Sequence, residues 1–305
     1  MIDIFIPSYH RPNNIKTAKY FIEKIGYDPK KIHVVIDDAT DDIEEYQKEV
    51  ERLECNLHIF NMEDSIKSYD YVHRVSELRR SAGQCRNMFF DIAKENNIDF
   101  YIVIDDDTNL FEIKPFGVYM RGAILEDFEM VFEGIKEFMQ KQKIGVFALS
   151  QTGDVFAVPD YKIFRKKVMN TTFYNTKYIY KGEKSTLDSD TSLFVNLMNE
   201  GYFTGSTATG LVLSQTTSAK QKGGLTPTYN ENRLLSKALV IPIQFPSLCH
   251  AERQKKNGNR LHHKIRYKNL FPCIIKGERS NIAWDTYPED VPFTNEPKRK
   301  NNEQK

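Results

Sequence analysis

Short apolar segments alternate with segments of helical periodicity along the first hundred residues. The apolar segments are rich in β-branched and aromatic residues and stop at polar ones, which predicts a buried strand at each. They are residues 2–6, 33–36, 57–60 and 100–104. Apolar residues at helical spacing predict helices between them. These helices are residues 11–25, 42–53 and 81–97, and Gly26 ends the first of them. This alternation predicts an α/β fold with a mostly parallel central sheet flanked by helices.

The pattern changes after residue 110, where we expect a mixed second half of the same domain. Its predicted elements are an amphipathic helix at 125–142, a buried strand at 144–149, antiparallel structure at 168–180, a helix at 190–199 and a strand at 210–214. A polar segment with two glycines, 215–228, predicts a mobile loop. The predicted division is therefore 1–110, 111–291 and a disordered polar tail at 292–305.

Composition narrows the class of protein without identifying it. The 305 residues are 28% charged and 40% hydrophobic, with a net charge of +1, as in ordinary globular proteins. We find no basic leader and no apolar run of about 18 residues, so we expect no signal peptide and no membrane partner. The four cysteines are widely spaced without a Cys-x-x-Cys pair. They predict reduced thiols, and a cytoplasmic location, rather than a zinc site or a disulfide scaffold.

Three consecutive carboxylates, Asp105, Asp106 and Asp107, end the fourth predicted strand. Their mutual repulsion predicts that they lie where the strand leaves the core. Open α/β sheets bind ligands at this edge. Clustered carboxylate oxygens suit Mg²⁺ or Mn²⁺, which leave coordination positions open for phosphate oxygens. The alternatives are a solvated acidic turn, or Asp107 or Thr108 as a helix cap.

Other polar residues follow the first two predicted strands and belong to the same edge of the sheet. They are Pro7, Ser8 and Tyr9 after the first strand, and Asp37 and Asp38 after the second. We expect this edge to hold a nucleotide, with Asp37 or Asp38 hydrogen-bonding its base or ribose. Turn formation is the alternative explanation for both aspartates.

A glycine and an arginine open the helix predicted before the fourth strand. Gly83 would let the backbone approach a ligand, and Arg86 supplies a fixed cation for a phosphate or a carboxylate. The alternative is a helix start with a surface arginine.

Taken in order, these features resemble the nucleotide-sugar domain of GT-A fold glycosyltransferases. The series is Ile-Pro-Ser-Tyr-His-Arg-Pro at 6–12, the acidic exit of the second strand, Gly83-x-x-Arg86-Asn87 and the acid triplet, and it spans residues 1–110. The resemblance implies a GT-A-like (Rossmann-like) sheet, a nucleotide-diphosphate sugar donor, with a UDP-sugar as the first choice, and hexosyl or pentosyl transfer. It makes Asp105 and Asp107 the Asp-x-Asp motif that bridges Mn²⁺ or Mg²⁺ to the diphosphate. The donor pocket would comprise Pro7, Ser8, Tyr9, Arg11, Asp37, Asp38, Gly83, Arg86, Asn87, Asp105 and Asp106.

The resemblance also implies an acid before a helix in the acceptor half, and a carboxyl-terminal histidine on the metal. Asp190 or Asp188 matches the acid as a general base, with helix capping as the alternative. His250 is our expected metal ligand, with His262 and His263 as further candidates. At most one of the last two is a ligand, because neighbours on a strand point to opposite faces.

The carboxyl-terminal part is basic, with nine Lys or Arg and two Glu over residues 251–280, interleaved with aromatic residues. Such a segment can follow a phosphate backbone and stack on bases. The alternatives are a solvated basic surface, or Lys and Arg side chains that bind the donor diphosphate. With this end, the chain resembles phage-type DNA base glycosyltransferases, including the TET-associated group. That resemblance implies a hydroxymethylpyrimidine acceptor in DNA and, for a phage protein, the host cytoplasm.

Three other functions stay open. One is transfer to a glycan or protein. A second is nucleotidyl transfer, which would place a Gly-rich phosphate loop where Pro7, Ser8 and Tyr9 stand. The third is non-catalytic nucleic-acid binding on the same fold.

Overall fold

The computed structural model describes thirteen segments of the chain. They are residues 1–40, 42–69, 82–108, 111–114, 127–151, 168–169, 171–178, 188–199, 204–206, 210–213, 234–254, 260–266 and 269–270. The loop predicted at 215–228 and the tail predicted at 292–305 lie outside these segments.

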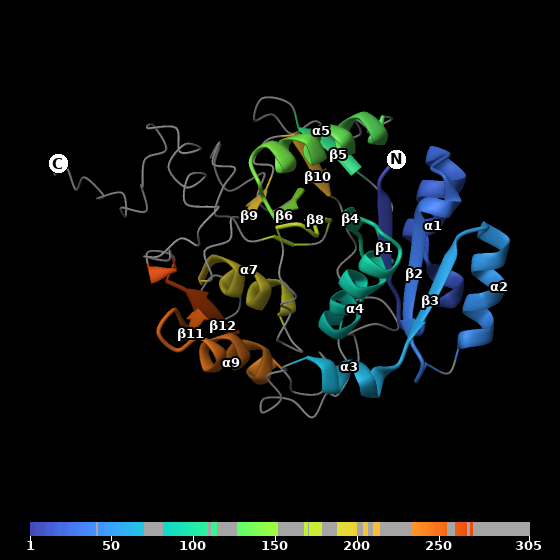
Figure 1. Ribbon diagram of the computed structural model, residues 1–305. Helices are drawn as coiled ribbons and strands as arrows, with labels where there is room; N and C mark the ends of the chain where they lie inside the picture. The colour runs from blue at the N-terminus through green and yellow to red at the C-terminus, as the bar shows by residue number, and fades with distance from the viewer. Residues whose placement is uncertain are drawn as a thin grey trace, which may run out of the picture.

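A seven-stranded sheet forms the centre of the molecule, in the order β3-β2-β1-β4-β8-β6-β9 (Figure 1). The strands are β1 (Asp3–Pro7), β2 (Ile32–Asp37), β3 (Asn56–Phe60), β4 (Phe100–Val103), β6 (Val146–Ala148), β8 (Thr172–Asn175) and β9 (Thr204–Ser206). Strand β8 is antiparallel to both neighbours, and every other adjacent pair is parallel. The predicted mostly parallel α/β fold with a mixed second half is therefore confirmed.

Helices cover both faces of this sheet (Figure 1). They are α1 (Lys16–Lys19), α2 (Ile43–Leu53), α3 (Met62–Ser68), α4 (Ala82–Glu95), α5 (Phe128–Lys141) and α7 (Ser189–Asn199). Successive side chains of β1 pack on opposite faces of the sheet, because side chains alternate in direction along a strand. Ile4 and Ile6 pack with α2 and α5, whereas Phe5 packs with α4 and α7. Burial on both faces explains why these strands are continuously apolar.

The two parts of the chain share this sheet. Strand β4 of residues 1–110 pairs with β8 of residues 111–291. Their division into a donor half and an acceptor half stays a prediction.

The helix predicted over residues 11–25 is broken into three short pieces. A 3₁₀ turn, η1 (Pro12–Asn14), precedes α1, and a π-helical turn, η2 (Tyr20–Ile25), follows it. The backbone N–H of Thr17 donates to the carbonyl of Asp106, so a tertiary contact replaces the regular helical hydrogen bond there. Gly26 ends the segment with φ of 72°, as predicted.

Several smaller elements were not predicted. They are the 3₁₀ turn η3 (Pro29–Lys31), α3, the strands β5 (Phe111–Lys114), β7 (Ser150–Gln151) and β9, the helix α9 (Leu234–Gln244), and the hairpin β11 (Cys249–Gln254) with β12 (Arg260–Ile265). Strands β5 and β7 flank β10 (Gly210–Leu213) in a second sheet. Helix α9 is apolar around most of its circumference and contains Pro242, so it has no helical pattern of polar positions. Helices α7 and α9 and the hairpin share a separate apolar core.

None of the helices among the described residues combines the length and apolar character needed to span a membrane.

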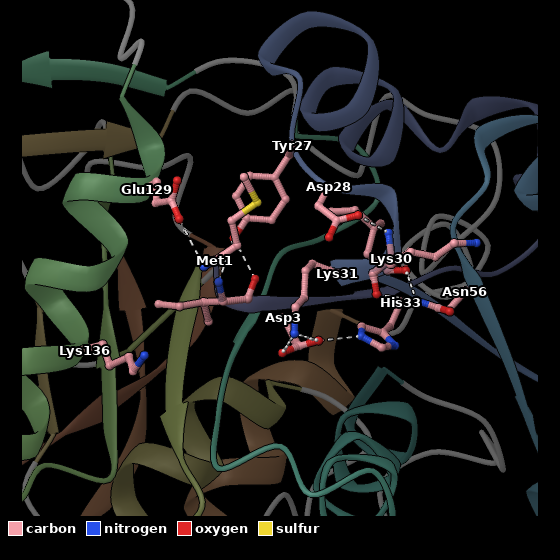
Figure 2. Close-up of polar contacts among 12 residues, drawn as sticks. Met1, Asp3, Tyr27, Asp28, Lys30, Lys31, His33, Asn56, Glu129 and Lys136 are labelled. Carbon is pink, nitrogen blue, oxygen red and sulfur yellow. Dashed lines mark hydrogen bonds and ion pairs between the residues drawn. The ribbon is translucent and has the colours of Figure 1, made fainter.

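A buried polar row crosses the first three strands. His33 Nε2 lies 3.0 Å from Asp3 Oδ1, and His33 Nδ1 lies 2.9 Å from His58 Nε2. Figure 2 shows Asp3 between His33 and Lys31, whose Nζ is 3.2 Å from the carboxylate. Burial and the neighbouring His33 lower the pKa of His58 from its ordinary 6.5 to about 4. The pKa of Asp3 is also lowered, because hydrogen bonds from His33 and Lys31 outweigh the effect of burial.

We predict that His58 makes the fold acid-sensitive. Its folded-state pKa of about 4 is below its ordinary 6.5, so the unfolded chain binds more protons between these values and stability falls as pH drops from 6.5 to 4. His58→Gln removes this titration. The melting temperature of the variant should therefore fall less than that of the wild type between pH 7.5 and 4. Parallel curves over that range would contradict the prediction.

Candidate active site

The carboxyl ends of β1, β2, β3 and β4 meet at one edge of the sheet. Backbone hydrogen bonds run from Ser8 N to Val35 O, from Asp38 N to Phe60 O and from Ile104 N to Phe5 O. Pro7 is the last residue of β1, and the ring of Tyr9 follows at the same edge, 4.0 Å from the ring of His10. The predicted donor residues that follow the strands are therefore neighbours in space.

The acid turn, residues 105–108, leaves β4 with its three carboxylates in different environments. The Asp105 side chain is 32% exposed, whereas those of Asp106 and Asp107 are 7% and 9% exposed. The alternative of a fully solvated acidic turn is therefore wrong.

Asp106 points into the protein and joins the acid turn to the loop that follows β1. Its Oδ2 accepts a hydrogen bond from Ser8 Oγ at 2.8 Å, and its Oδ1 accepts one from Arg11 Nη1 at 2.8 Å. The hydroxyl of Tyr46, from α2, contacts Ser8 Oγ at 2.8 Å and accepts from the Arg11 backbone N–H. Burial raises the pKa of Asp106 although Arg11 opposes the shift. These contacts indicate that Ser8, Arg11 and Asp106 position the site, and contact of these three residues with a donor stays a prediction.

Asp107 is the acid of the turn whose ionised form is least favoured. Burial, followed by the charges of Asp105 and Asp106, raises its pKa to about 6, and Arg11 Nη1 lies 3.8 Å away. A divalent cation would relieve this crowding of like charges. Across the described residues, no group of three or more His, Cys, Asp or Glu is arranged to hold a metal. Two carboxylates still fit Mg²⁺ or Mn²⁺, because such ions commonly take one or two protein carboxylates together with substrate phosphates.

Arg86 connects the acid turn to the start of α7. It donates from Nη2 to Asp105 Oδ1 at 3.0 Å and from Nη1 to Ser189 Oγ at 3.2 Å. Gly83 and Asn87 are buried beside it on α4. Arg86 is therefore paired with a carboxylate of the protein itself, and its contact with a ligand stays a prediction. The predicted donor side and the predicted acceptor side are thus adjacent.

Asp37 and Asp38 hold the loops after β2 and β3. Asp37 Oδ1 accepts from the Ala39 N–H, and the Asp38 carboxylate accepts from Asn61 Nδ2 and the Met62 N–H. The turn role is present for Asp37, whereas Asp38 joins the loop after β2 to the loop after β3, and contact of either residue with a nucleoside stays a prediction.

Asp188 and Asp190 flank the first residue of α7. Asp188 has φ of 50°, and its carbonyl accepts from the N–H groups of Thr191 and Ser192. The carbonyl of Asp188 therefore takes part in the first hydrogen bonds of the helix, and its side chain is directed to other partners. That carboxylate lies 3.4 Å from Lys237 Nζ, on α9, and 3.2 Å from His263 Nδ1, on β12. Asp190 lies in the first turn of the helix and is half-buried.

The structure brings His263, rather than His250, to this site. In the hairpin, Cys249 pairs with Ile265 and Ala251 with His263. Cys249 and Ile265 belong to the apolar core, so His263 shares their inward face. His250 belongs to the opposite face and lies 3.7 Å from Glu252. Strand alternation therefore argues against our choice of His250. The expectation that His262 and His263 point to opposite faces is not confirmed, because their ring centroids lie only 4.3 Å apart.

Solved structures with similar folds include glycosyltransferases. Glucosyl-3-phosphoglycerate synthase from Mycobacterium tuberculosis, in complex with Mn²⁺, UDP-glucose and phosphoglyceric acid, is 9% identical, with a TM-score of 0.47 over 87% of this chain and 86% of that chain. Mannosyltransferase PcManGT from Pyrobaculum calidifontis, in complex with GDP-Man and Mn²⁺, is 12% identical, with a TM-score of 0.47 over 80% of this chain and 63% of that chain. Resemblances this distant do not assign a donor or a metal to this chain. No curated protein matches the sequence.

A family model gives the decisive comparison. Residues 2–224 match the model of the TET-Associated Glycosyltransferase family, and this segment is well over half of the 305-residue chain. The match covers all seven strands of the central sheet and the acids of β4 and α7. The chain therefore belongs to the TET-associated glycosyltransferase family.

Proposed function

We propose that this glycosyltransferase moves a sugar from a nucleotide-diphosphate donor to a hydroxymethylpyrimidine in DNA. The observation that carries the proposal is the pair of hydrogen bonds from Arg86, one to Asp105 and one to Ser189. They place the acid turn next to the start of α7. One side offers carboxylates for a cation and diphosphate, and the other offers acids for an acceptor hydroxyl.

On the donor side, Asp105 and Asp107 would hold Mn²⁺ or Mg²⁺. When bound, the cation neutralises charge that develops on the diphosphate leaving group. Arg11 and Ser8 keep Asp106 turned inward, which leaves Asp105 and Asp107 as the carboxylates for the cation. A UDP-sugar is the first donor to test.

On the acceptor side, Asp190 or Asp188 would accept the proton of the attacking hydroxyl. Asp188 already contacts Lys237 and His263, so these two residues fix its position. The role of His263 as a metal ligand in place of His250 belongs to the same proposal.

DNA is the preferred acceptor for two reasons. The family is named for its association with TET, and the TET-associated group that the sequence resembles acts on hydroxymethylpyrimidines. The hairpin that carries His263 also exposes Arg253, Lys264 and Arg266, which suit a phosphate backbone. The target base would be reached in the major groove or flipped out of the helix. Such a substrate places the protein in the cytoplasm, or in the host cytoplasm if a phage encodes it.

We predict sugar transfer to hydroxymethylated DNA in the presence of Mn²⁺. Purified protein is incubated with each common nucleotide sugar and duplexes that contain hydroxymethylpyrimidine or the unmodified base, and mass spectrometry measures the nucleosides. Only the hydroxymethylated duplex should gain a sugar mass. Asp190→Asn and Asp188→Asn test the base, and the essential variant should lose transfer by about a hundredfold or more while it still binds donor.

Transfer to a glycan or a protein, with none to DNA, would overturn the DNA acceptor. Absence of both binding and hydrolysis with every donor would overturn the donor site.

A further inference from the structure

We propose that Thr17 is a positioning residue that fixes the acid turn in the geometry that holds the metal and the donor diphosphate. The inference rests on the proposed function of Asp105 and Asp107. Nothing in the sequence pattern distinguishes Thr17 from any other polar residue of the segment 11–25.

The side chain of Thr17 is fully buried and engages the acid turn from both sides. Its hydroxyl lies within hydrogen-bond distance of the carbonyls of Asp105 and Thr108, at 3.0 Å for the second. Because a hydroxyl has one hydrogen, it donates to one of these oxygens at a time. The hydroxyl oxygen of Thr17 also accepts a hydrogen bond from the Thr108 N–H at 2.9 Å.

The backbone of Thr17 holds the middle of the turn. Its N–H donates to the carbonyl of Asp106 at 3.2 Å. One residue therefore engages backbone groups of Asp105, Asp106 and Thr108. These backbone groups fix the direction in which the three carboxylates leave the turn.

The turn needs an external support. Its own hydrogen bond, from the Thr108 N–H to the Asp105 carbonyl, is long at 3.4 Å. The turn carries three adjacent carboxylates, two of which are buried, and repulsion between these like charges would spread the turn apart. A metal site tolerates displacements of only about 0.5 Å. Removal of the hydroxyl would also remove the 2.9 Å hydrogen bond that the buried Thr108 N–H donates to it.

The test compares Thr17→Val, which removes the hydroxyl but keeps the branched shape, with Thr17→Ser, which keeps the hydroxyl. Mn²⁺ affinity is measured by electron paramagnetic resonance, and donor KM and kcat by the transfer assay. Thr17→Val should weaken Mn²⁺ binding and raise donor KM about tenfold, the effect of one lost hydrogen bond. Thr17→Ser should stay within about threefold of the wild type.

Thr176→Val is the matched control. The Thr176 hydroxyl donates to the carbonyl of Asp99 at 3.0 Å, just before β4 and therefore at the other end of that strand. This variant loses a hydroxyl-to-carbonyl hydrogen bond at an exposed position far from the acid turn, and its Mn²⁺ affinity and donor KM should equal those of the wild type. If Thr17→Val does not fold, Thr17→Cys, a weaker hydrogen-bonding group of similar size, must shift Mn²⁺ affinity in the same direction.

Two outcomes would overturn the inference: wild-type Mn²⁺ affinity and donor KM in Thr17→Val, or equal losses in Thr17→Val and Thr17→Ser. Asp107→Asn separates this failure from failure of the proposed function. If Asp107→Asn retains Mn²⁺ affinity, the proposed metal site is wrong. If Asp107→Asn loses it and Thr17→Val does not, only the role of Thr17 is wrong.

Discussion

Asp107→Asn is expected to abolish glycosyl transfer and, at the same time, to raise the stability of the ligand-free protein. Loss of one metal-binding carboxylate should lower kcat/KM by on the order of a hundredfold to a thousandfold. The stability gain follows from the raised pKa of Asp107, about 6, which burial and the charges of Asp105 and Asp106 cause. At neutral pH the fold keeps this carboxylate ionised against its preference, and a neutral amide of the same shape removes that penalty.

The size and pH dependence of the stability gain follow from the same pKa. The shift from the ordinary 3.8 to about 6 corresponds to a gain on the order of 1–3 kcal/mol at pH 7.5. A raised carboxyl pKa means that the folded wild type binds more protons than the unfolded chain between these values. The difference between variant and wild type should therefore shrink as pH falls from 6 towards 4.

Chemical denaturation at several pH values and the transfer assay test both effects. Asp127→Asn is the control, because Asp127 caps α5 at an exposed position and asparagine caps equally well. It should match the wild type in stability and activity. An Asp107→Asn variant that is less stable than the wild type at pH 7.5, or that transfers sugar at the normal rate, would contradict the prediction.

Arg11→Met is expected to destabilise the protein by about 3–5 kcal/mol. Its guanidinium is buried, 2.8 Å from Asp106 and 3.8 Å from Asp107. Removal of this cation leaves two buried carboxylates without their nearest positive charge, and desolvation makes such charges unfavourable. The double variant Arg11→Met with Asp106→Asn removes the principal unpaired charge and should recover at least half of the loss.

Arg52→Met is the matched control for this substitution. Arg52 also bridges two carboxylates, those of Glu23 and Glu49, but its side chain is 51% exposed. Solvent screening limits such pairs to about 1 kcal/mol or less. Urea denaturation of the single and double variants measures each loss. Equal losses in Arg11→Met and Arg52→Met, or no recovery in the double variant, would show that the Arg11–Asp106 pair does not support the site.

The sequence by itself determined the first four strands, the helices α2 and α4 between them and the edge at which the acids gather. These features depend on local patterns, because side-chain period and turn residues act over a few positions. Gly26, for example, ends its segment through its own backbone freedom. The three adjacent acids marked the end of β4, but repulsion between them did not keep them out of the core, because Asp106 and Asp107 are buried.

Only the tertiary structure decided which way each acid faces and which residues hold it. Asp106 turns inward because Ser8, Arg11 and Tyr46 surround it, and Thr17 engages the acid turn from a broken helix. His263 lies inward and His250 outward because the register of a hairpin absent from the sequence pattern sets their faces. Arg86 and Ser189 are 103 residues apart, and no local pattern encodes a contact over that separation. Such contacts form only when the sheet brings distant segments together, and the chemistry of the site depends on them.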